Sequence, residues 1–343
     1  MFVKRCWYVA CWSHELDDGV LLARTVLGEP LVLYRSEAGA PVVLQDRCCH
    51  RGAPLSLGRR EGDCVRCLYH GLKFEPGGRC VEIPGQDTVP AKARVRSYPV
   101  VERSRWVWVW LGDPAEADPA LIPDTHWLDD PQWRSLPGRM HYDIGHLAIA
   151  DNLLDFNHLP FVHPTTLGGS EQYAWERPIV ERLERGVRVT RWVMNIAPPP
   201  FVAAVAGWTA PVDRWNIYEF NVPGIFVMDS GVAPAGQGAR EGNRAQALQF
   251  HSCQALTPET AASTHYFFAQ PHDFALDRPE VTRSLHDIIV KAFAEDEHMI
   301  GAQQRTLALD PDFEMLPLAM DAALTHYRRV YERMLAEEAM AID

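Results

Sequence analysis

The sequence contains no long apolar run and no cluster of basic residues. Its apolar stretches all fall short of the ~18 residues expected of a membrane-spanning helix. Its formal net charge is −12 over 343 residues, and no basic run is present that is typical of nucleic-acid or anionic membrane binding. The N-terminal MFVKRCWYVACWSHELDDG has neither an apolar h-region nor a cleavage site of small residues, so no signal peptide is predicted. We therefore expect a cytoplasmic protein with no nucleic-acid or membrane partner.

Two further features are missing, an internal repeat and a dinucleotide-binding motif. No GxGxxG follows a strand-like run and opens a helix, so this chain is not expected to bind NADH itself. The sequence does contain eight cysteines. In a chain of this length without an export signal, cysteines are more often metal ligands or free thiols than disulfide partners.

Composition divides the chain into two parts and a connecting segment. Residues 1–112 contain short runs rich in β-branched and aromatic residues, broken by Gly, Pro and Asp, and are predicted to be all-β. Residues 113–125 are rich in Pro, Asp and Ala without periodicity, which indicates a linker. Residues 126–343 combine strand-like runs with apolar residues at helical spacing over 277–304 and 320–340. The predicted class is α+β, with helices to one side of a sheet in the second domain.

The stretch DRCCHRGAPLSLGRREGDCVRCLYHG, residues 46–71, concentrates possible metal ligands. It forms two knuckles, Cys48-x-His50 and Cys67-x-x-His70, whereas a zinc finger groups its cysteines in one arm and its histidines in the other. One cysteine and one histidine per knuckle suit a two-iron cluster. Cys48 and Cys67 would bind one iron, and His50 and His70 the other. The alternative is a structural zinc site drawn from Cys48, Cys49, Cys64 and Cys67.

The segments CCHRGAPLSLG and CLYHGLKFEPGGRCVEIPG resemble the signature of Rieske [2Fe–2S] domains. The glycine that follows each histidine belongs to this signature, because it lets the backbone turn tightly and direct amide N–H groups at the cluster sulfurs. Cys49 stands where the family usually has proline, and we expect it to be a spare thiol.

A second group of polar residues follows the linker, in DNLLDFNHLPFVHP, residues 151–164. Three of its members are spaced by three residues and would share one face of a helix: Asn152, Asp155 and His158. Pro160 predicts that this helix ends at about Leu159. His163 would then lie on the next turn, free to approach His158. Two histidines near an acidic residue are the beginning of a 2-His-1-carboxylate site for non-haem Fe(II), which leaves positions open for O₂.

The order of these motifs resembles the catalytic subunit of Rieske non-haem iron oxygenases over almost the whole chain. That family carries the motif Asn-x-x-Asp-x-x-His-x-x-x-x-His. The resemblance implies a helix-grip-like catalytic domain and a mononuclear Fe(II) bound by His158 and His163. It also implies a carboxylate ligand on a long downstream helix. In AFAEDEHMIGAQQR, Asp296 fits that position best, and Glu295 and Glu297 are the neighbouring alternatives.

The same resemblance implies a role for Asp155 in electron transfer. The corresponding acid of the family hydrogen-bonds an iron-binding histidine and a cluster histidine of the neighbouring subunit, so Asp155 is expected to join His158 to His70 of the next chain. A head-to-tail contact must close into a ring, which predicts a homotrimer. Asn152 is expected to support the same helix face, in either a catalytic or a structural role.

The implied activity is that of a terminal oxygenase supplied with electrons by a separate flavin and iron–sulfur reductase that oxidises NADH. Chain length, the IPGQ after the cluster motif, and LTPETAASTHYFF are similar to the branch of vanillate and dicamba O-demethylase oxygenases. That branch hydroxylates a methyl or O-methyl group of an aromatic acid with O₂, and O-demethylation releases formaldehyde.

Two other functions remain open at this point. A ring cis-dihydroxylating dioxygenase usually has a longer catalytic chain and a β-subunit partner. An electron carrier of the Rieske ferredoxin type would need only the first of the two domains. For the substrate, His251 and Gln254 on a predicted strand are candidate contacts, or else a buried polar pair with no substrate role.

Overall fold

The computed structural model describes residues 1–17, 19–168 and 170–340, and these form two compact units. The first unit consists of Met1–Ile122 with Thr257–Ala261, and the second of Pro123–Leu256 and the rest of the chain from Ala262. Most of the segment expected as a linker therefore belongs to the first unit. There Trp7 donates a hydrogen bond from Nε1 to the carbonyl oxygen of Asp118, at 2.8 Å.

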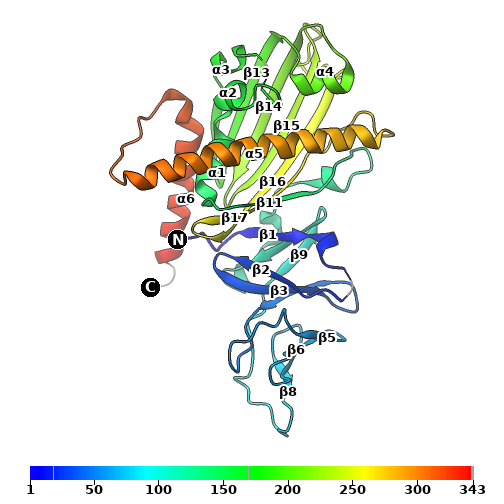
Figure 1. Cartoon of the computed structure of the whole chain (residues 1–343), viewed down its shortest axis with the longest axis vertical. Helices are drawn as coiled ribbons and strands as arrows, with labels where there is room; N and C mark the ends of the chain where they lie inside the picture. Colours follow the sequence, from blue (N-terminus) through cyan, green and yellow to red (C-terminus); the bar gives the residue numbers. More distant parts are fainter. Residues whose placement is uncertain (18, 169, 341–343) are drawn as a thin grey trace. The chain divides into compact units, whose positions relative to one another are not determined.

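The first unit is built from three small antiparallel sheets (Figure 1), as the all-β expectation requires. Their orders are β1-β10-β9, β2-β3-β4 and β5-β6-β7-β8. The strands span β1 Trp7–Trp12, β2 Leu22–Val26, β3 Glu29–Arg35, β4 Pro41–Gln45, β5 Arg59–Glu61, β6 Cys64–Arg66, β7 Lys73–Phe74, β8 Cys80–Glu82, β9 Val100–Arg103 and β10 Trp106–Trp110. All five residues of β10 are buried, so this strand is covered on both faces.

The second unit contains one seven-stranded antiparallel sheet, in the order β11-β17-β16-β15-β14-β13-β12. Its strands are β11 Gly138–Tyr142, β12 Ile179–Leu183, β13 Gly186–Ile196, β14 Val212–Asn221, β15 Ile225–Pro234, β16 Leu248–Thr260 and β17 Ser263–Ala269. Its helices are α1 His146–Leu154, α2 Leu159–Val162, α3 Gln172–Trp175, α4 Pro200–Ala206, α5 Pro279–Leu309 and α6 Ala322–Met340. Figure 1 shows α5 crossing one face of this sheet, which confirms the α+β class.

Helix α5 positions the carboxylate of the site described below. Its buried side is a stripe at spacings of three and four, formed by Val281, Leu285, Ile289, Ala292, Phe293, Asp296 and Ile300. Asp296 is the only charged residue of this stripe. Its inward direction therefore follows from the period of the helix. Among the described residues, no helix, α5 included, is long and apolar enough to cross a membrane.

The prediction that one helix carries Asn152, Asp155 and His158 on one face is wrong. Helix α1 ends at Leu154, and Asp155 is extended, with φ −118° and ψ 97°. A 3-10 turn, Phe156–His158, follows, and α2 begins at Leu159. The Asp155 carboxylate accepts a hydrogen bond from the Asn157 N–H at 2.8 Å, which favours a new turn at this point. Pro160 lies in the first turn of α2, where its missing N–H costs no hydrogen bond.

Candidate metal centres and active site

Two loops of the first unit have the same backbone hydrogen bonds. In each loop a cysteine N–H, of Cys48 or Cys67, donates to the carbonyl five residues on at 2.8 Å. The carbonyl of the same cysteine accepts from a glycine N–H, of Gly52 or Gly71, at 2.9 Å. These glycines have φ of +71° and +77°, a conformation that side chains disfavour. The two knuckles are therefore copies of one tight turn.

The ligands of the two knuckles differ in exposure. The thiols of Cys48 and Cys67 are buried, whereas the imidazoles of His50 and His70 are exposed, with ring centroids 4.5 Å apart. Burial, with the neighbouring Cys67 thiol, raises the pKa of Cys48 to about 11. Holding Cys48 as a thiolate at neutral pH thus requires a nearby cation. The pairing of two buried sulfurs with two exposed imidazoles fits a cluster with Cys₂ and His₂ irons.

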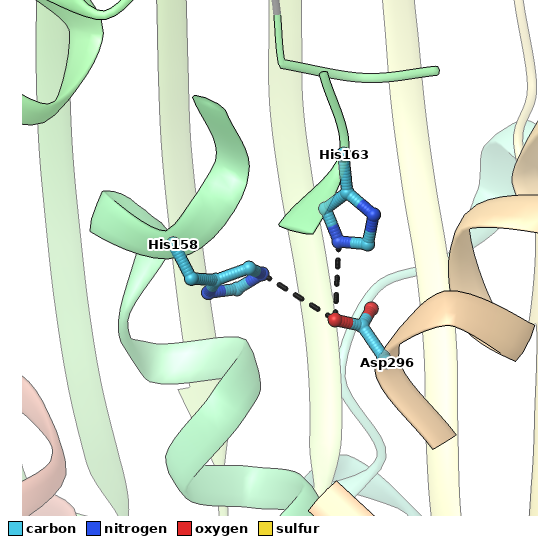
Figure 2. A group of neighbouring side chains, drawn as sticks. All are labelled: His158, His163 and Asp296. Atoms are coloured by element: carbon cyan, nitrogen blue, oxygen red, sulfur yellow. Dashed lines mark hydrogen bonds and ion pairs between the residues drawn. The ribbon is translucent and has the colours of Figure 1, made fainter. Parts of the chain in front are cut away.

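The second unit brings together the residues expected to bind a mononuclear metal. Figure 2 shows both imidazoles directed at the carboxylate of Asp296. The Nε2 atoms of His163 and His158 lie 3.0 Å and 3.5 Å from Oδ1 of Asp296. One ligand atom from each residue falls within 4.8 Å of the others. Nitrogen and oxygen ligands about 2.1 Å from an ion stand about 3.0 Å apart when adjacent in an octahedron. The donor set and its spacing thus fit Fe(II) in a 2-His-1-carboxylate site.

The electrostatics of this triad also suit a cation. Burial lowers the pKa of His163, but hydrogen bonds and charge from Asp296 and Glu295 outweigh burial, and the pKa is raised. An added positive charge is therefore stabilised here. Burial lowers the pKa of His158, which favours the neutral imidazole that can bind a metal.

Glu295 orients one of the two histidines. Its Oε2 accepts a hydrogen bond from Nδ1 of His163 at 2.8 Å and another from the Thr166 hydroxyl at 2.9 Å. With the proton of His163 on Nδ1, the lone pair of Nε2 faces Asp296. This is the carboxylate–histidine–metal arrangement that fixes a ligand's tautomer. Glu295, considered from sequence only as an alternative ligand, thus serves a different purpose.

The other histidine is oriented by backbone. Nδ1 of His158 donates to the carbonyl oxygen of Asp155, not to its carboxylate. The Asp155 carboxylate accepts from Asn157 N–H through Oδ1, and its Oδ2 has no partner among the described residues. Asn152 donates from Nδ2 to Oδ1 of Asp296 at 3.1 Å. Asn152 thereby holds the carboxylate of the triad in place.

Glu295→Gln is expected to weaken mononuclear iron binding about 10- to 100-fold, because the amide is a poorer acceptor and removes a negative charge near His163. Iron retained against a chelator measures this, and the visible spectrum of the Rieske cluster should not change. Glu297→Gln, two residues along α5, is the control with unchanged iron affinity. Equal retention by both variants would contradict the orienting role.

A cavity opens beside the triad in the second unit. The space between its lining residues, together with the solvent at its mouth, is about 780 Å³. Its walls are largely apolar, and they include Leu153, Phe156, Phe201, Leu285, Ile289 and Phe293. A flat, apolar molecule can thus approach the triad.

The two expected substrate contacts lie in different places. Gln254 lines the cavity, donates to the Ser252 hydroxyl at 2.8 Å and accepts from the Tyr266 hydroxyl. His251 is not among the lining residues. Its ring stacks on Trp127, with centroids 3.8 Å apart, and meets the edge of Trp133. Burial lowers the pKa of His251 to about 4, so it is neutral at physiological pH.

A two-iron cluster domain joined to an oxygen-activating iron site defines an iron-dependent oxygenase. Residues 6–99 match the Rieske [2Fe-2S] domain, which favours the cluster over the zinc alternative. Residues 143–337 match the vanillate O-demethylase oxygenase C-terminal domain. The chain belongs to the Rieske non-haem iron oxygenases, in the branch of the vanillate and dicamba O-demethylase oxygenases.

Relatives of similar length support this assignment. The chain is 48% identical to the toluene-4-sulfonate monooxygenase system iron-sulfur subunit TsaM1 of Comamonas testosteroni, over 98% of both chains. It is 37% identical to the vanillate O-demethylase oxygenase subunit of Pseudomonas sp. (strain HR199 / DSM 7063), over 100% of this chain and 98% of that one.

A solved structure agrees. Dicamba monooxygenase bound to 3,6 dichlorosalicylic acid has a TM-score of 0.91 and 34% identity, covering 98% of this chain and 99% of that one. The chain is thus an oxidoreductase, the oxygenase component of a Rieske monooxygenase, rather than a ring dioxygenase or an electron carrier.

Proposed function

We propose that this oxygenase hydroxylates a methyl or O-methyl group of a small aromatic acid, with O₂ and with electrons that a separate reductase takes from NADH. The observation that carries the proposal is the position of His158, His163 and Asp296 at a cavity with mostly apolar walls. The names of two relatives support it, since toluene-4-sulfonate carries a ring methyl group and vanillate a methoxy group.

Each group of residues has a separate role in this proposal. Iron bound by His158, His163 and Asp296 would supply oxygen activation, and the Rieske cluster would supply electrons. Glu295 and the Asp155 carbonyl hold the imidazole protons on Nδ1, away from the metal position. The apolar wall that α5 provides excludes water and accepts the aromatic ring.

The atom balance of O-demethylation is simple. An aryl methyl ether, O₂, NADH and a proton give a hydroxymethyl ether, NAD⁺ and water. One oxygen atom enters the methyl carbon and the other leaves as water. The hydroxymethyl ether is a hemiacetal, which collapses to a phenol and formaldehyde. A ring methyl group would instead give a stable benzylic alcohol.

Electron transfer is proposed to run between chains. Asp155 would accept a hydrogen bond at Oδ2 from His70 of the next chain and so join the cluster of one chain to the iron site of another. Two observations support this: Oδ2 lacks a partner among the described residues, and His70 is exposed. A head-to-tail contact of this kind closes into a ring, and the family resemblance implies that the ring is a homotrimer. Dependence on an NADH-oxidising reductase places it in the cytoplasm.

Turnover of toluene-4-sulfonate under ¹⁸O₂, with a surrogate reductase and NADH, should give a benzylic alcohol with one ¹⁸O atom. Turnover of 4-methoxybenzoate should give the phenol and formaldehyde in equal amounts. Mass spectrometry and a formaldehyde assay measure the two products, and reactions without reductase are the control. A ring diol carrying two ¹⁸O atoms would refute the proposal in favour of a dioxygenase.

A further inference from the structure

One permanently charged cation lines the cavity among the described residues, and it is Arg214 of β14. Only 5% of its surface is exposed. Its guanidinium lies over the ring of Tyr173, 4.8 Å from the centroid. One terminal nitrogen, Nη1, donates to the carbonyl oxygens of Leu167 and Gly168 at 3.1 and 2.9 Å. Arg214 is thus a fixed side chain inside the protein rather than a mobile surface group.

Arg214 has no negative partner among the described residues. Within residues 1–17, 19–168 and 170–340, its Nε and Nη2 atoms make no hydrogen bond and no carboxylate lies within 4 Å of the guanidinium. Burial lowers the pKa of Arg214, because the surrounding protein solvates the charge less well than water does. By contrast, the buried Arg24 of the first unit pairs with Glu15 at 2.8 Å. Because buried charges are normally paired, the missing anion at Arg214 is expected to come from a ligand.

The neighbours of Arg214 offer further donors. Asn216 follows it on the same face of β14 and lies opposite Ser230 of β15 in the strand register. In the described part of the chain, Nδ2 of Asn216 has only the sulfur of Met228 as acceptor, at 3.2 Å, and the Ser230 hydroxyl makes one long hydrogen bond of 3.5 Å to the carbonyl of Phe250. Both also line the cavity. A carboxylate or sulfonate could therefore accept hydrogen bonds from Asn216 and Ser230 in place of these weak contacts, and the bonds to its charged oxygens would be stronger.

We propose that Arg214, with Asn216 and Ser230, binds the carboxylate or sulfonate of the substrate and so selects aromatic anions. This inference rests on the proposed function. Arg214 is also connected to the metal site. It donates hydrogen bonds to the carbonyls of Leu167 and Gly168. The Gly168 N–H in turn donates to the carbonyl of His163 at 2.9 Å. The loop that Arg214 contacts thus also carries His163. The anionic group of a bound substrate would therefore lie at a fixed distance from the triad, and so would the opposite end of its aromatic ring.

A local cation is needed because the chain as a whole repels anions, with a formal net charge of −12. A second buried arginine lies beside the same tyrosine. Arg191 lies over the same Tyr173 ring, at 4.9 Å, and donates to the Tyr173 carbonyl and to Oδ1 of Asn157. Arg191 does not line the cavity. It is therefore a matched control that has similar burial and the same aromatic contact.

The test compares Arg214→Met with Arg191→Met in the metal-loaded, anaerobic enzyme by calorimetry. The probes are 4-methoxybenzoate, toluene-4-sulfonate and the neutral 4-methoxybenzamide. Arg214→Met should weaken both anions about 10- to 100-fold, as expected for a buried charge-assisted contact. The amide should bind with nearly unchanged affinity, and Arg191→Met should leave all three affinities near wild type. Arg214→Lys should recover part of the loss, since it keeps the charge but not the planar fork.

Other outcomes decide against the anion site. If Arg214→Met weakens the amide as much as the anions, or releases iron, the arginine only holds the loop of Leu167 and Gly168. If the wild-type enzyme binds the amide as tightly as the anions, no anion is selected. The ratio of the affinities for 4-methoxybenzoate and toluene-4-sulfonate shows whether the site prefers a carboxylate or a sulfonate. A wild-type enzyme that discriminates through Arg214 but forms no hydroxylated product would overturn the proposed function and still support the anion site.

Discussion

Asp296→Ala should remove the mononuclear iron and with it all product formation, while the Rieske cluster remains. Asp296 supplies the only carboxylate of the triad, and its charge stabilises a cation beside His163. Alanine suits the apolar stripe of α5, so the helix should still pack. Total iron should fall from about three atoms per chain to about two, with the visible and electron paramagnetic resonance spectra of the cluster retained.

The neighbours of Asp296 provide the control for this experiment. Glu297→Ala changes the adjacent acid, which lies outside the triad, and should keep all of the iron and activity. Glu295→Ala should weaken iron binding without removing the ligand itself. If Asp296→Ala keeps full iron and Glu295→Ala loses it, Glu295 is the ligand. A colourless preparation of every variant would contradict the assignment of the cluster loops as well.

The sequence predicted the fold wherever the signal was periodic and failed where a single residue changed the backbone. Short runs rich in β-branched and aromatic residues predicted the strands. The apolar stripe of α5 was recognisable from the helical spacing of apolar residues over 277–304. The prediction of one helix across residues 151–159 was wrong. Polar residues spaced by three fit a helix but do not require one. Instead α1 ends at Leu154, and the Asp155 carboxylate caps a new 3-10 turn by accepting from the Asn157 N–H. Such contacts depend on side-chain direction, which spacing alone does not contain.

The site could be predicted only as far as local motifs reach. Both histidines belong to a motif, and Asp296 was predicted as the residue that best fits the carboxylate position implied by the family resemblance. His251 and Gln254, in contrast, are three residues apart on β16, and odd separations on a strand point to opposite faces. They could not both line one cavity, and that argument was available from the sequence. Arg214 had no such signal: only the pairing of β14 with β15 beside Tyr173 makes it a buried cation.

Asp155→Asn should leave both metal sites filled and nearly abolish product formation coupled to NADH oxidation. Asparagine keeps the oxygen that accepts from the Asn157 N–H, so the turn before α2 is retained. It removes the negative charge proposed to bind His70 of the next chain. Stopped-flow reoxidation of the reduced cluster, with substrate and O₂, should slow strongly, while substrate affinity stays the same. Reoxidation at the wild-type rate would eliminate the bridging role.

Mixed oligomers can tell transfer between chains from transfer within one chain. The first variant, Asp155→Asn, keeps its cluster, but its iron site can no longer receive electrons. The second, Cys67→Ser, should lack the cluster and keep the triad. Each homo-oligomer should be inactive. Co-expressed with different tags and purified as mixed oligomers, they should regain activity, because the cluster of the first variant then faces the intact Asp155 of the second. If electrons instead passed within one chain, neither subunit would have a complete path and the mixture would stay inactive. Recovery of turnover therefore requires that electrons pass between chains and that the receiving chain has an intact Asp155.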